Sequence, residues 1–269
     1  MTDERRVALI GTGVMGETLL SGLLKAGWRT HWIIGAERRA ARRDELTQRY
    51  GVEVAHDNAE AVDGADMIIL VVKPQDVSLL LPEIHDRVAP GALVVSLCAG
   101  ITTAQLEGGL PAGTPVVRVM PNTPAQVGEG MAALSPGTHA TEAHLERVVE
   151  VMEAVGRAVI VPERYQDAVT AISGSGPAYL YFVVEAMIDA GVMMGLPRDT
   201  ATLLVNQTMY GSAKLLVESG EHPNLLRERV TSPAGTTAAA LREMEERSVK
   251  AAFIAAMHAA RDRSVELGR

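Results

Sequence analysis

The stretch Val7-Ala8-Leu9-Ile10-Gly11-Thr12-Gly13-Val14-Met15-Gly16 decides the fold prediction for this chain. Its four leading apolar residues predict a buried strand, and the Gly-x-Gly-x-x-Gly spacing directly after them predicts a tight turn into a helix. Glycines in such a turn let a pyrophosphate approach the backbone and rest on the helix N-terminus. Glycine-rich turns are common, so the motif alone is weak evidence, but its strand–turn–helix context favours a dinucleotide site over an ordinary turn.

Beyond this turn, β-branched runs alternate with helical patterns as far as about Val161. Such alternation implies right-handed βαβ units and a mostly parallel sheet covered on both faces. The predicted strands are Val7–Ile10, Trp32–Ile34, Met67–Val72, Leu93–Leu97, Val116–Met120 and Ala158–Val161. The predicted helices of this half are Glu17–Ala26, Arg38–Tyr50 and Glu142–Val155.

After about Arg164 the alternation stops and the pattern is helical throughout. The predicted helices are Pro177–Met194, Thr200–Ser219, Thr237–Glu246 and Val249–Val265. Aromatic residues make up only 3% of the chain while Ala, Gly and Met are plentiful, which favours closely packed helices. The sequence therefore predicts an α/β protein with an N-terminal Rossmann domain over residues 1–164 and an all-α domain over residues 165–269.

Composition limits the partners that this chain can have. A formal charge of −8 argues against nucleic acid, which needs a basic face. The uncharged stretch Ala168–Val184 is too broken by Ser173–Pro177 to span a membrane, and the seven histidines show no zinc-ligand spacing. The single cysteine, Cys98, cannot form an intramolecular disulfide. We therefore expect a cytoplasmic protein with no metal site and no nucleic-acid or membrane partner.

The end of the second predicted strand bears on the choice of dinucleotide. NAD sites usually place an acidic side chain there for the ribose 2′-hydroxyl, whereas NADP sites place an arginine near the 2′-phosphate. Arg38 and Arg39 fall where that phosphate would lie, so NADP is favoured, while Glu37 keeps NAD open as the alternative. Arg42 and Arg43 are interpreted as a solvated helix face.

Two turns follow later strands at the edge where open α/β sheets bind ligands. The turn Val71-Val72-Lys73-Pro74 could border the nicotinamide ribose, and a surface lysine in a proline-fixed turn is an equally good interpretation. The turn Leu97-Cys98-Ala99 would cover the nicotinamide. Cys98 is interpreted there as a small packed residue and not as a nucleophile.

Two polar segments stand out in the helical half. Ser173–Tyr179 predicts a flexible polar turn with Pro177 in the first turn of the next helix. Val230–Thr237 carries four hydroxyl residues within Thr231–Thr237, again leading into a helix. Ordinary N-capping explains one such hydroxyl, but four exceed what one cap needs. Consecutive amides and hydroxyls at a helix N-terminus favour a carboxylate site.

The Val230–Thr237 run, followed by Ala240-Leu241 and Met244-Glu245, resembles the signature of pyrroline-5-carboxylate reductases. Its core is intact as Ser232-Pro233-Ala234-Gly235-Thr236-Thr237, except that many members have glycine where this chain has Ala234. A methyl group there is tolerable unless the residue needs positive φ. The resemblance covers the whole chain, because further motifs follow in the family's order, namely Gly11–Gly16, Val71–Pro74, Met120–Pro124 and Ser173–Tyr179.

The resemblance implies a Rossmann domain and a helical domain that interlocks with its twin in an obligate dimer, with further assembly, commonly into decamers, in several members. It implies NADPH-dependent hydride transfer to the C=N bond of 1-pyrroline-5-carboxylate, a cyclic imine carboxylate, giving L-proline in the last step of proline biosynthesis. The active site would lie at the dimer interface. NADPH is expected as the preferred cofactor, with NADH as the alternative.

Matching positions also assign residues. The implied substrate contacts are Ser232, Gly235, Thr236 and Thr237, with the Thr237 hydroxyl as catalytic group at the ring nitrogen. The implied cofactor contacts are Ile10, Gly11, Thr12, Gly13, Val14, Met15, Gly16, Arg38, Asn58, Val71, Val72, Lys73, Pro74, Leu97, Cys98 and Ala99.

Two other functions remain open at this point. A β-hydroxyacid dehydrogenase would resemble the first domain, but it needs a lysine early in the long helix after the junction, and Ser173–Tyr210 contains none. A non-catalytic NADP-binding sensor is the other alternative, since Rossmann folds host many functions. Such a sensor would have no reason to keep the hydroxyl-rich loop Val230–Thr237.

Overall fold

In the computed structural model, which describes residues 6–268, the strand Val7–Ile10 (β1) lies inside a sheet of eight strands ordered β3-β2-β1-β4-β5-β6-β7-β8. The other strands are β2 Ile33–Ala36, β3 Glu53–Ala55, β4 Met67–Leu70, β5 Leu93–Ser96, β6 Val116–Met120, β7 Gly130–Pro136 and β8 Gly156–Ile160. Neighbouring strands run parallel except β6 and β7. The strand order reverses between β1 and β4, and ligands bind at the carboxyl ends of strands at such a switch point.

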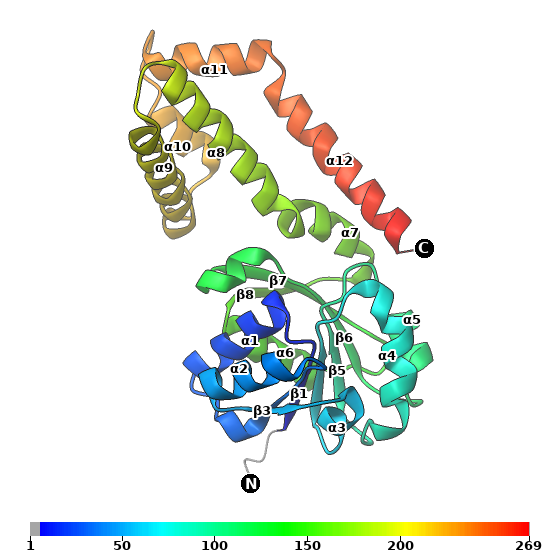
Figure 1. Ribbon diagram of the computed structural model, residues 1–269. Helices are drawn as coiled ribbons and strands as arrows, with labels where there is room; N and C mark the ends of the chain where they lie inside the picture. Colours follow the sequence, from blue (N-terminus) through cyan, green and yellow to red (C-terminus); the bar gives the residue numbers. More distant parts are fainter. Residues whose placement is uncertain (1–5, 269) are drawn as a thin grey trace. The chain divides into compact units, whose positions relative to one another are not determined.

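Helices cover both faces of this sheet (Figure 1). They are α1 Val14–Lys25, α2 Ala40–Tyr50, α3 Asn58–Val62, α4 Val77–Ile84, α5 Thr103–Gly109 and α6 Glu142–Glu153. Alternate residues of β1 enter two separate cores, with Leu9 packed among residues of α1, α2 and α6, and Ile10 among residues of α3, α4 and α5. Burial on both faces explains why the central strands are continuous apolar runs.

The chain divides into two compact units, Met1–Ser175 with Ala260–Arg269 and the inserted Gly176–Ala259. Beyond β8 every regular element is helical, with α7 Gln166–Val169, a π-helical turn Thr170–Gly174, α8 Gly176–Met193, α9 Arg198–Ser219, α10 Pro223–Arg229, α11 Thr236–Glu246 and α12 Val249–Leu267. Small residues allow α8 and α9 to approach closely, since a Cβ on Gly191 would stand 3.1 Å from the Cβ of Ala201. None of the helices within residues 6–268 has the length and apolar character of a membrane span.

The predicted fold class is confirmed, with a mostly parallel Rossmann sheet followed by an all-helical region. The prediction of a flexible polar turn at Ser173–Tyr179 was wrong. The π-helical turn ends at Gly174 and α8 begins at Gly176, so the backbone there is nearly continuous helix. The sequence analysis also missed β3, β7, α3, α4, α5 and α10.

Candidate functional site

Close backbone packing explains two of the three motif glycines between β1 and α1. Gly11 has φ +99°, and a Cβ on it would lie 2.7 Å from the carbonyl oxygen of Val71. A Cβ on Gly16 would lie 2.1 Å from the carbonyl oxygen of Gly11. Neither position has room for a side chain, so the turn brings β1, β4 and α1 into direct contact.

Gly13 differs from the other two motif glycines. It is the N-cap of α1, no side chain caps the helix there, and a Cβ on Gly13 would meet nothing within 4 Å. The N-terminus of α1 is therefore uncapped by side chains, with open space at Gly13. A pyrophosphate fits such a place, because the helix N-terminus supplies both hydrogen-bond donors and a favourable dipole.

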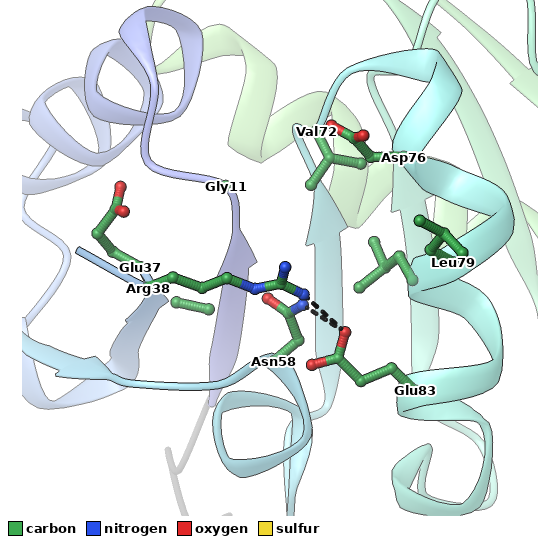
Figure 2. Close-up of a pocket in the computed structure, with 10 residues that line it drawn as sticks. Gly11, Glu37, Arg38, Asn58, Val72, Asp76, Leu79 and Glu83 are labelled. Atoms are coloured by element: carbon green, nitrogen blue, oxygen red, sulfur yellow. Dashed lines mark hydrogen bonds and ion pairs between the residues drawn. The ribbon is translucent and has the colours of Figure 1, made fainter.

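A cavity of about 300 Å³ opens next to this turn, between β2, α3 and α4 (Figure 2). Its lining residues are Gly11, Ala36, Glu37, Arg38, Asn58, Val72, Asp76, Leu79, Leu80 and Glu83. The cavity brings together four of the predicted cofactor contacts, namely Gly11, Arg38, Asn58 and Val72. Its position at the end of β2 is where the adenosine half of a dinucleotide binds in this fold.

Glu37 is held in place at the end of β2. Its carboxylate accepts hydrogen bonds from the Thr12 hydroxyl at 3.0 Å, the Arg39 amide at 2.9 Å and the Arg39 Nε at 3.0 Å. Hydrogen bonding to Arg39 is the main reason that the pKa of Glu37 falls from 4.5 to about 2, against the opposing effect of desolvation. Glu37 is therefore a fixed, ionised carboxylate in the cavity wall.

Arg38 and Asn58 meet at one acidic side chain. Glu83, on α4, accepts a hydrogen bond from Arg38 Nη2 at 3.2 Å and another from Asn58 Nδ2 at 3.0 Å, both on its Oε2 atom. Figure 2 shows the three side chains converging across the cavity from the segment after β2, from α3 and from α4. The sequence analysis did not identify Glu83, because it lies in a helix that showed no motif.

Arg42 and Arg43, at the start of α2, make side-chain contacts that the sequence pattern did not predict. Arg42 forms ion pairs with Glu17 and Glu45, and Arg43 donates hydrogen bonds to the backbone carbonyls of Glu37 at 3.1 Å and Arg38 at 2.8 Å. Both side chains are half-buried, so the interpretation of Arg42 and Arg43 as a solvated face was wrong. Arg43 fixes the backbone that carries Glu37 and Arg38.

The two turns at the ends of β4 and β5 lie side by side. The Leu97 amide donates to the carbonyl of Leu70, and the Cys98 thiol lies 3.3 Å from the carbonyl oxygen of Val72. Cys98 is buried, so the prediction of a packed residue is confirmed, and desolvation raises the pKa of its thiol. Lys73 and Pro74 are exposed, which leaves both interpretations of Lys73 open.

The hydroxyl-rich loop forms the start of α11 in the inserted unit. Gly235 is the N-cap of α11 and no side chain caps the helix, so the amides of Thr236 and Thr237 are the first of the helix. A Cβ on Gly235 would lie 2.3 Å from the Ser232 hydroxyl, so a side chain there would displace that hydroxyl. Ala234 has φ +58°, the condition under which its methyl group costs energy. The predicted substrate contacts thus cluster around one uncapped helix N-terminus.

Asn122 is a further residue whose side-chain contacts the sequence analysis did not anticipate. Its Nδ2 donates to the Ser173 carbonyl at 3.2 Å, and its Oδ1 accepts from the Met131 amide at 2.8 Å. It therefore ties the π-helical turn to β7. Within residues 6–268 no group of three or more His, Cys, Asp or Glu side chains is placed to hold a metal ion.

Two family profiles match the chain. Residues 163–267 match the family described as pyrroline-5-carboxylate reductase dimerisation. Residues 6–100 match the family described as NADP oxidoreductase, coenzyme F420-dependent. The first profile covers most of the helical half and the second covers the glycine turn and the cavity.

Relatives cover the full length. The pyrroline-5-carboxylate reductase of Corynebacterium melassecola is 46% identical over 266 residues, which are 98% of each chain. The solved structure of a pyrroline-5-carboxylate reductase from Coxiella burnetii is 33% identical with a TM-score of 0.95, covering 99% of this chain and 100% of that one. The Plasmodium falciparum pyrroline carboxylate reductase, solved with NADP bound, is 29% identical with a TM-score of 0.88 and full coverage of both. On this evidence, the chain belongs to the pyrroline-5-carboxylate reductase family.

Proposed function

We propose that this chain reduces 1-pyrroline-5-carboxylate to L-proline with NADPH. The observation that carries the proposal is the cavity beside the glycine turn, which is lined by Gly11, by Arg38 after β2 and by Asn58 in α3. Family membership points to the same reaction, and relatives aligned at full length bear the name of this enzyme.

The cofactor is assigned to the residues around the turn. The α1 amides beyond Gly13 would bind the pyrophosphate, and Arg38 with Asn58 would bind the 2′-phosphate. The turns Val71–Pro74 and Leu97–Ala99 would border the nicotinamide end. When bound, the reduced nicotinamide supplies a hydride to the imine carbon.

The substrate is assigned to the N-terminus of α11. The amide of Thr236, with the Ser232 hydroxyl, would hold the carboxylate, while the Gly235 amide already donates to the carbonyl of Ser232 at 3.0 Å. The Thr237 hydroxyl would hydrogen-bond the ring nitrogen and keep its proton in place. A protonated imine is a good hydride acceptor, so the protein needs to orient it and place no strong base beside it.

The roles of the two domains, the assembly of the protein and its location are further parts of the proposal. We assign cofactor binding to residues 1–164 and dimerisation with substrate binding to residues 165–269. The dimerisation match supports self-association, and we propose a cytoplasmic protein that forms a dimer, with the decamer as the alternative assembly. Sedimentation velocity on the purified protein distinguishes the dimer from the decamer by mass.

The direct test is loss of NADPH absorbance when purified protein meets 1-pyrroline-5-carboxylate, with proline identified as the product. The same assay with NADH measures the cofactor preference. We expect rapid turnover with NADPH and slower turnover with NADH. Binding of NADPH without turnover would overturn the proposal in favour of an NADP-binding sensor.

A further inference from the structure

One carboxylate already occupies the place assigned to the 2′-phosphate. Glu83 Oε2 lies 3.2 Å from Arg38 Nη2 and 3.0 Å from Asn58 Nδ2. Arg38 lies in the segment after β2, Asn58 is in α3 and Glu83 is in α4, so the contact joins three parts of the chain across the cavity (Figure 2). A carboxylate oxygen between a guanidinium and an amide has the hydrogen-bonding environment that a phosphate oxygen would have.

The cavity lining holds more acidic than basic side chains, so the pairing of Arg38 with Glu83 affects the charge available to a ligand. Among the residues that line it, all in the described part of the chain, Arg38 is the one cation, and Glu37, Asp76 and Glu83 are the acidic residues. The neighbouring guanidinium of Arg39 is bound to Glu37. Within the cavity lining, the positive charge available to a 2′-phosphate is therefore the charge that Glu83 already pairs. Arg43 binds the backbone carbonyls of Glu37 and Arg38 but does not line the cavity.

We propose that Glu83 is a specificity-determining residue that competes with the 2′-phosphate for Arg38 and Asn58 and so reduces the preference for NADPH over NADH. The proposal rests on the assignment of this cavity to the cofactor. NADPH must displace Glu83 from both donors, whereas NADH carries no 2′-phosphate and leaves the contacts intact. A displaced Glu83 stays close to the bound phosphate and repels it, since both are anions.

The displacement is feasible because the contact is at the surface. The Arg38 side chain is 75% exposed and that of Glu83 is 31% exposed, so both can move without unpacking the core. A phosphate carries more charge than a carboxylate and can bind a guanidinium with two hydrogen bonds, so it wins the competition at a reduced margin. Glu83 thus tunes affinity and does not block the site.

The test compares Glu83→Gln with the wild-type protein by titration calorimetry of NADP+ and NAD+ into the purified full-length chain. We expect the Kd for NADP+ to fall about two- to fivefold, the range set by loss of one exposed ion pair. The Kd for NAD+ should change by less than about twofold, because NAD+ has no phosphate at this position. Glu83→Asp, which keeps the charge but shortens the reach, should give an intermediate change for NADP+.

Asp86→Asn is the matched control. Asp86 follows α4, is exposed and lies outside the cavity lining, so this variant removes one negative charge without touching Arg38 or Asn58. An unchanged or weaker NADP+ affinity in Glu83→Gln would overturn the proposal. So would an equal gain for NAD+, or the same gain in Asp86→Asn, since either would indicate a general charge effect. Intact NADP+ binding without imine turnover would count against the proposed reaction alone.

Discussion

Thr237 occupies the second position of α11, is half-buried and follows directly on the uncapped amide of Thr236. Thr237→Ala should lower kcat/KM for the imine by at least about tenfold, because it removes a hydrogen bond to the ring nitrogen and a route for its proton. Steady-state kinetics with saturating NADPH measures the change. Thr208→Ala, an exposed threonine on α9, is the matched control. Unchanged kcat/KM in Thr237→Ala would remove Thr237 from the mechanism.

Ala234 adopts a left-handed backbone with φ +58° in the loop before α11. An L-residue with a Cβ is strained there and glycine is not, although glycine also gains entropy in the unfolded chain. Ala234→Gly should therefore raise the free energy of unfolding by about 0.5–1 kcal/mol. Urea denaturation at fixed protein concentration measures it as a higher midpoint with an unchanged slope.

The control for this prediction lies five residues further on. Ala239→Gly, within α11, should lower the free energy of unfolding by about 1 kcal/mol, because glycine is a poor helix former. Equal effects of the two substitutions would show that the backbone at Ala234 is not strained.

The sequence predicted some residues of the candidate site and missed others. The motif glycines, Arg38 and Asn58 follow from spacing and resemblance, and the structure gathers Gly11, Arg38 and Asn58 around one cavity. Glu83 could not be predicted, because its partner Arg38 is 45 positions away and the contact depends on how α4 packs against the sheet.

At the scale of elements, Glu37 ties the end of β2 to two neighbours. Its carboxylate binds Thr12 in the β1–α1 turn and Arg39 at the start of α2. Because the folded state lowers the pKa of Glu37 from 4.5 to about 2, the ionised form stabilises the fold. This contribution is complete above pH 4.5 and is lost as the pH falls towards 2.

Glu37→Gln should therefore be less stable than the wild-type protein near neutral pH, and the difference should shrink as the pH falls from 4.5 towards 2. Denaturant unfolding at a series of pH values gives the two curves. Glu60→Gln, an exposed glutamate on α3, controls for the loss of one carboxylate. Parallel curves for Glu37→Gln and the wild type would contradict the role of this network.

Strands with a strong apolar pattern of their own were predicted. Strands that form mainly because they pair with neighbouring strands were not. The buried runs of β1, β4, β5 and β6 are apolar throughout or nearly so, and each was found close to its true bounds. The segment Gly130–Pro136 contains Gly, two Ala, Ser and Pro, yet forms β7 because it pairs with both β6 and β8. Strand formation there comes from tertiary pairing, which local propensity does not record.

At the scale of the whole molecule, the dimerisation match indicates self-association. In the inserted unit, large apolar side chains of α8 and α9 are exposed, among them Phe182 at 72% and Leu203 at 70%. Exposed apolar surface of this kind marks an interaction site. Phe182→Asp should shift the protein towards smaller assemblies, as measured by light scattering after gel filtration.

Val127→Asp provides the comparison for that experiment. Val127 is 77% exposed but lies in the other unit, in the short helix Thr123–Val127. Its replacement should leave the assembly unchanged. A fully assembled Phe182→Asp protein would show that this part of α8 does not contribute to association.

The return of the chain to its first unit at Ala260 has a consequence for biosynthesis. The Ser264 hydroxyl donates to Asp167 at 2.7 Å, so α12 completes a structure begun nearly a hundred residues earlier. Domains usually fold in order as they leave the ribosome. Here the unit that emerges first lacks its last helical segment until the inserted unit has been made, so its final packing is coupled to late translation.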